Sequence, residues 1–162
     1  MTETNSVYAF DRDWTVDVRP HPERQTVPIS WISQLKERED TAVYAIGNQR
    51  LTYEIDIPGA ADLFSQQGLY PIRRKILRLL VPADYYLSRF AMLKSPLRLS
   101  GGLGHPLFMR DRRERLQILS QLYPNVDQRV VVDDVNLSDV DGWVHYYPWD
   151  FIDAVENGTI EL

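Results

Sequence analysis

Cysteine is missing from this sequence, and histidine is scarce. The three histidines, at positions 21, 105 and 145, are scattered along the chain. Disulfide bonds and cysteine metal sites are therefore excluded, and no pair of histidines has the spacing of metal ligands. We interpret the histidines as structural, which leaves acidic residues as the candidate metal ligands.

Long apolar runs are also missing. No stretch approaches the roughly 20 apolar residues that a membrane helix needs. The first six residues, Met-Thr-Glu-Thr-Asn-Ser, are polar and do not look like a signal peptide. We therefore expect a soluble, cytoplasmic protein with no membrane partner. A chain of 162 residues with 44% hydrophobic residues has the length and composition of one folded unit, so we expect a single domain over residues 1–162.

Charge is distributed unevenly along the chain. The net charge is −5, but residues 70–115 contain 11 lysines and arginines against 3 acidic residues, so they carry +8 and the remainder carries −13. Such a basic segment can attract phosphates, nucleic acid or an acidic protein. Solvated helix faces are the simpler explanation, and binding of a protein partner is the alternative.

The main pattern in the sequence is an apolar stretch that is followed directly by aspartates. Residues Val7 to Phe10 have strand preference and no polar alternation, which predicts a strand buried on both faces, as in a parallel sheet covered by helices. Asp11 and Asp13 follow at the carboxyl end, where open α/β sheets bind ligands. Two carboxylates this close repel each other, so the pair predicts a divalent cation or a raised pKa.

A second stretch repeats this pattern near the other end of the chain. Residues 129–132, Arg-Val-Val-Val, predict another buried strand, and it is followed by Asp133, Asp134, Asp139 and Asp141. If the two strands are neighbours in one parallel sheet, their carboxyl ends place these acids together. The remaining apolar patterns predict strands over 41–46 and 142–147, and helices over 28–39, over 111–122 and from 148 to before Gly158.

The two acidic motifs resemble those of the haloacid dehalogenase-like hydrolases, which are mostly magnesium-dependent phosphatases. Residues 11–16, Asp-Arg-Asp-Trp-Thr-Val, look like the first motif of that family, a hydrophobic strand followed by Asp-x-Asp-x-Thr. Residues 132–139 are similar to its last motif, in which a strand is followed by Asp-Asp and a further Asp.

The resemblance implies an α/β fold, a Rossmann-like three-layer α/β/α sandwich with a central parallel sheet. The gap between the first motif and the second strand is too short for a large cap domain. Residues 51–106 would then form a basic and aromatic insertion or a rudimentary cap.

The resemblance also implies roles for the acids. Asp11 is expected to be the nucleophile and Asp13 the general acid and base, with Mg²⁺ as the cofactor. The expected metal ligands are Asp11, Asp13, Asp133, Asp134 and Asp139. Thr15 would belong to the residues that bind the substrate phosphate.

Two positions depart from the pattern of the family. Ile46 ends the second strand where the family has Thr or Ser to hold the phosphoryl group, so Gly47 and Asn48 are the candidates for that contact. Arg112 or Arg113 takes the place of the family's lysine before the last motif. Arginine keeps the positive charge and forks well onto phosphate.

We therefore expect a Mg²⁺-dependent phosphohydrolase that forms an aspartyl-phosphate intermediate and acts on a phosphorylated small molecule or a phosphoprotein. Because two family positions are altered, the alternative is a catalytically degenerate relative that acts as a binding or regulatory module, with a protein partner on the basic central segment. A small metal-dependent nuclease resembling PIN domains is a third and less favoured hypothesis, so nucleic acid is not the partner we expect.

Overall fold

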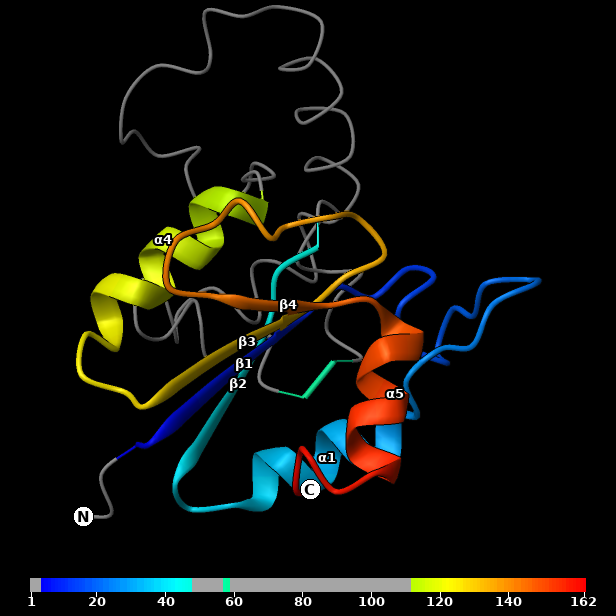
Figure 1. Ribbon diagram of the computed structural model, residues 1–162, viewed down its shortest axis with the longest axis horizontal. Helices are drawn as coiled ribbons and strands as arrows, with labels where there is room; N and C mark the ends of the chain where they lie inside the picture. The colour runs from blue at the N-terminus through cyan, green and yellow to red at the C-terminus, as the bar shows by residue number, and fades with distance from the viewer. Residues whose placement is uncertain (1–3, 48–56, 59–111) are drawn as a thin grey trace, which may run out of the picture.

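Figure 1 shows the computed structural model of the protein, which describes residues 4–47, 57–58 and 112–162. Most of the insertion expected over 51–106 lies outside the described residues, as does most of the basic segment 70–115. Within the described ranges no helix combines the length and the apolar character needed to cross a membrane. The elements in chain order are β1 (Ser6–Phe10), α1 (Ile29–Glu37), β2 (Thr41–Ala45), α4 (Arg112–Leu122), β3 (Gln128–Val132), β4 (Val144–Tyr146) and α5 (Pro148–Glu156).

The strands form one sheet in the order β2-β1-β3-β4, and every neighbouring pair is parallel. Phe10, the last residue of β1, is aligned with Ala45 in β2 and with Val132 in β3. Because the strands run in the same direction, their carboxyl ends lie at one edge of the sheet. The α/β class expected from the apolar strands is confirmed, and the element boundaries differ from the expected ones by at most two residues.

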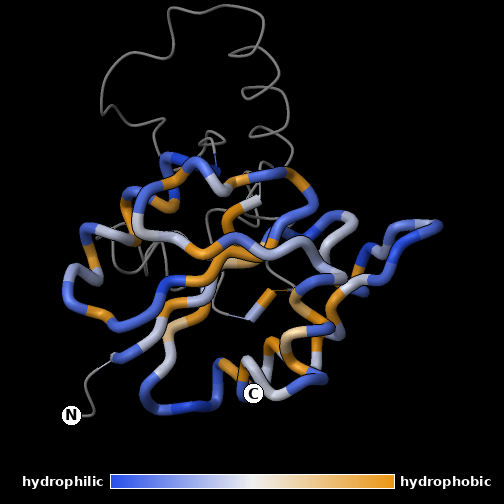
Figure 2. Tube along the Cα trace, viewed as in Figure 1, coloured by the Kyte–Doolittle hydropathy of each residue, from blue (hydrophilic) through white to orange (hydrophobic). Residues whose placement is uncertain are grey.

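Both faces of the sheet are covered by helices (Figure 1). Tyr8 and Phe10 of β1 point to the face that packs with α1 and α5, and Val7 and Ala9 point to the face that packs with α4. Figure 2 shows hydrophobic residues concentrated in the strands between these helices. A strand covered on both sides needs apolar residues at every position, which explains the continuous apolar run in the sequence.

Aromatic rings connect α5 to the sheet. Phe151 of α5 is fully buried and meets the ring of Phe10 edge-on at a centroid distance of 5.6 Å. The rings of Tyr8 and Tyr146 approach Phe151 in the same way, at 6.5 and 6.2 Å. Edge-to-face pairs add to the free energy of apolar burial, so Phe151 anchors this helix.

Truncating this anchor is expected to destabilise the fold. Phe151→Ala leaves a cavity between α5 and the sheet and should lower the free energy of unfolding by about 3–5 kcal/mol. The matched control is Val18→Ala, at a side chain that is 40% exposed, which should cost less than about 0.5 kcal/mol. Urea denaturation followed by circular dichroism measures both, and a similar small loss in the two variants would contradict the packing described above.

Candidate metal centre

Three of the predicted metal ligands meet at the carboxyl edge of the sheet. Asp11 directly follows β1, and Asp133 and Asp134 directly follow β3. Because the parallel register aligns Phe10 with Val132, the residues that follow are brought side by side. One carboxylate oxygen of each of the three acids lies within 4.8 Å of the other two.

Asp133 is the most buried of these acids. Its Oδ1 accepts a hydrogen bond from the backbone N–H of Val135 at 2.8 Å and another from the guanidinium of Arg112. Its Oδ2 is buried and has no hydrogen-bond partner in the part of the chain that the structure describes. A buried acceptor without a partner carries the full cost of its desolvation. A cation bound among the acids would remove that cost.

Burial makes it difficult to ionise the whole cluster. Loss of solvent raises the pKa of Asp11 to about 6; the charge of Arg112 opposes this rise, and that of Asp134 adds to it. Burial, followed by repulsion from Asp11, raises the pKa of Asp133 to about 8. A cluster of hard carboxylate oxygens with excess negative charge suits Mg²⁺, whose charge would favour the ionised forms.

The two candidate phosphate-binding arginines take different positions. Arg112 begins α4, its side chain is 11% exposed, and it forms an ion pair with Asp133. Arg113 instead binds Asp139 through two hydrogen bonds of 3.0 Å, from Nε and Nη2. Asp139 is 62% exposed and is not a member of the acidic cluster. The structure therefore brings Arg112 to the candidate site and pairs Arg113 with a predicted ligand outside it.

Asp13 also lies outside the group of three carboxylates. Arg12 donates a hydrogen bond from Nε to its Oδ1 at 2.9 Å, and Nη1 of Arg19 lies 3.5 Å from its Oδ2. Of the five predicted ligands, the structure therefore gathers three, and Asp13 and Asp139 lie outside that group, each paired with an arginine.

The remaining candidates for phosphate binding surround the ends of β1 and β2. Thr15 is fully buried, and its Oγ1 has no hydrogen-bond partner among the residues described. Gly47 is buried just beyond β2, and Asn48 lies outside the described residues. Ile46 is fully buried and belongs to the same core cluster as Leu119 of α4. The apolar side chain at position 46 therefore belongs to the core.

The turn after β1 has an unusual backbone. Trp14 has a φ of 63°, in the left-handed region that favours glycine, and its side chain is 51% exposed. Its N–H donates to the carbonyl of Arg19 at 2.9 Å, and the N–H of Val16 donates to the carbonyl of Arg12 at 3.0 Å. The turn that carries Asp13 is thus fixed by backbone hydrogen bonds, and Figure 1 shows the loop that follows it, in blue, extending away from the sheet.

Two residues not assigned to the site from the sequence contact it. Nε2 of His145 lies 3.1 Å from the carbonyl oxygen of Asp133, and its ring meets that of Tyr147 at 4.7 Å. Arg12 pairs with Asp13 at 2.8 Å. His145 has no sequence signal because only the pairing of β3 with β4 brings it close. Arg12 does have one, since a cation between two acids suggests that it partners one of them.

Comparisons with protein-family models, with curated proteins and with solved structures found no match. The resemblance to the haloacid dehalogenase-like hydrolases therefore stays a prediction from the sequence motifs.

The raised pKa values of Asp11 and Asp133 predict how stability depends on pH. Between about pH 4 and pH 8 the unfolded chain loses the protons of these groups while the folded chain retains them, so the folded state becomes less stable as the pH rises. The metal-free protein should therefore be less stable at pH 8 than at pH 5. Mg²⁺ should restore more stability at pH 8 than at pH 5.

Asp133→Asn provides the test, because it removes one of the buried charges and keeps the side-chain size. Denaturation at pH 5 and pH 8, in EDTA and in Mg²⁺, should show a weaker pH dependence and a smaller effect of Mg²⁺ in this variant. Asp153→Asn, at an exposed position of α5, makes the same charge change elsewhere. If the two variants respond alike, the cluster is not the origin of the pH dependence.

Proposed function

We propose that the protein is a Mg²⁺-dependent phosphohydrolase that acts through Asp11 on a phosphorylated small molecule or a phosphoprotein. The observation that carries the proposal is the group of Asp11, Asp133 and Asp134 at the carboxyl edge of the sheet, with a buried Asp133 oxygen that has no partner among the described residues. The parallel sheet with helices on both faces supports a Rossmann-like three-layer α/β/α sandwich of the haloacid dehalogenase-like type.

Asp11 is suited to the role of nucleophile by its position. Its N–H donates to the carbonyl of Val132 at 3.0 Å, which fixes the backbone beside β3, and its side chain is 3% exposed. The ionised carboxylate would attack phosphorus in line with the departing oxygen. A bond from Asp11 to phosphorus would form as the bond to the leaving group breaks, giving an aspartyl-phosphate that water then hydrolyses.

Positive charge is needed to bring an anionic substrate to this cluster. Asp11, Asp133 and Asp134 would hold Mg²⁺, which when bound supplies charge neutralisation for the carboxylate nucleophile and the phosphate. Arg112 is already bound to Asp133 and adds a further positive charge beside the cluster. A guanidinium presents several donors, so Arg112 would bind a phosphate oxygen while it remains paired with Asp133.

Asp13 is the candidate for proton transfer. It would give a proton to the departing oxygen and then take one from the attacking water. Its side chain is 19% exposed, so the carboxylate is accessible from the edge of the sheet. Its contact with Arg19 is long, at 3.5 Å, and Arg19 is 62% exposed, so this is the contact that a substrate would displace most easily.

Asp11→Asn tests the proposed nucleophile. Hydrolysis of an aryl phosphate in Mg²⁺ should fall at least about 1,000-fold in kcat, because the amide cannot form the acyl phosphate. Fluoroberyllate, which mimics a phosphoryl group on a carboxylate, should bind the wild type and not this variant. Asp153→Asn should keep wild-type turnover, since that residue is exposed on α5.

Two outcomes would redirect the assignment. Full Mg²⁺-dependent turnover in Asp11→Asn would exclude an aspartyl-phosphate at this residue. If the folded protein binds Mg²⁺ but neither hydrolyses aryl phosphates, phosphorylated metabolites or phosphopeptides nor traps fluoroberyllate, the degenerate binding module becomes the better hypothesis. Salt-sensitive retention of nucleic acid would instead favour the nuclease.

A further inference from the structure

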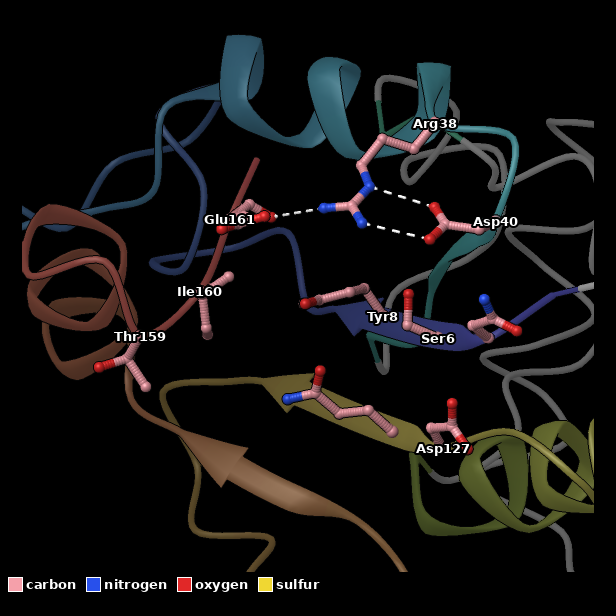
Figure 3. A pocket seen from close by; sticks show the side chains of 10 residues that line it. Ser6, Tyr8, Arg38, Asp40, Asp127, Thr159, Ile160 and Glu161 are labelled. Atoms are coloured by element: carbon pink, nitrogen blue, oxygen red, sulfur yellow. Dashed lines mark hydrogen bonds and ion pairs between the residues drawn. The ribbon is translucent and has the colours of Figure 1, made fainter.

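A pocket of about 270 Å³ opens at the amino ends of the strands, at the edge of the sheet opposite the metal centre (Figure 3). Its walls come from β1, β3, the turn between α1 and β2, and the segment that follows α5. A water molecule occupies about 30 Å³ in the liquid, so the pocket has room for a small organic molecule. The residues that decide its chemistry are Tyr8, Arg38, Asp40, Asp127, Gln128 and Glu161.

The positive charge in this pocket belongs to Arg38, which already pairs with Asp40. Nε and Nη2 of Arg38 donate to the two carboxylate oxygens of Asp40 at 3.2 and 3.3 Å, and Nη1 donates to the backbone carbonyl of Glu161 at 2.9 Å. These hydrogen bonds from Arg38 lower the pKa of Asp40. The carboxylates of Asp127 and Glu161 have no ion pair among the residues that the structure describes. The charge of Glu161 also acts on Arg38, and with three carboxylates against one guanidinium the lining has a net formal charge of −2.

Tyr8 supplies an unused polar group inside the pocket. The residue is 4% exposed, yet no hydrogen bond to its hydroxyl is found in the described part of the chain. Figure 3 shows the phenol directed into the pocket beside Ile160 and below Arg38, with Glu161 and Asp127 on opposite sides of it. The hydroxyl oxygen is not one of the fully buried polar atoms without a partner, so it is accessible to a ligand that donates to it.

We propose that this pocket binds a linear aliphatic diamine, with one ammonium group at Asp127, the other at Glu161, and an ammonium N–H donated to the hydroxyl of Tyr8. Ile160 supplies an apolar side chain to the same pocket. An anion would be repelled by the two free carboxylates, and a monoamine would leave one of them unmatched. The site is separate from the metal centre and does not depend on the proposed phosphohydrolase activity.

Isothermal titration calorimetry of the full chain with 1,4-diaminobutane tests the proposal. Butylamine and 1,4-butanediol are the matched ligands, which lack one or both ammonium groups. The diamine should bind about threefold to fivefold more tightly than butylamine, and the diol should show no binding, because only the diamine pairs with both carboxylates. Equal affinity for the diamine and the monoamine would overturn the proposal.

Variants separate a specific site from general attraction to a negatively charged chain. Asp127→Asn and Glu161→Gln should each reduce diamine affinity to that of butylamine, and Tyr8→Phe should weaken it severalfold while the folded circular dichroism spectrum is retained. Asp153→Asn makes the same charge change outside the pocket and should bind the diamine like the wild type. An equal loss in Asp153→Asn and Asp127→Asn would show non-specific binding and refute the site.

Discussion

Two carboxylates buried side by side, those of Asp11 and Asp133, impose the electrostatic constraint on which the rest of the structure depends. The parallel pairing of β1 with β3 places them side by side, because each directly follows one of two aligned residues. Desolvation opposes their ionisation and each charge opposes the other. Among the residues that the structure describes, Arg112 at the start of α4 supplies a compensating charge, and a divalent cation would supply the remainder.

Strand β1 runs from the polar pocket at one edge of the sheet to this acidic cluster at the other. β1 begins at the polar pocket, which Tyr8 helps to line, and ends at Asp11. Polar chemistry is possible at both ends because apolar side chains fill the faces between them, Val7 and Ala9 toward α4, Tyr8 and Phe10 toward α1 and α5.

Much of the fold was predictable because a sheet buried on both sides leaves continuous apolar runs, and these end where the acids begin. The order of the strands in the sheet was harder to predict. Residues 11, 133 and 134 could be expected together only on the assumption that β1 and β3 are neighbours, which the structure confirms. The pairing of Arg12 with an adjacent acid could be expected from the sequence, whereas the pairing of Arg113 with Asp139 could not, because those residues are far apart in the chain. The pocket had no sequence signal, because the turn before β2 and the segment after α5 meet there only in the folded chain.

The central position of β1 also restricts where residues can be inserted into or deleted from this protein. A single-residue deletion within β1 would move each following side chain to the other face, because strand side chains alternate. The rings of Tyr8 and Phe10 would then meet α4 in the space made for Val7 and Ala9, and Asp11 would rotate away from Asp133. Insertions and deletions should therefore be tolerated in the surface loop over residues 17–26 and be selected against inside the strand.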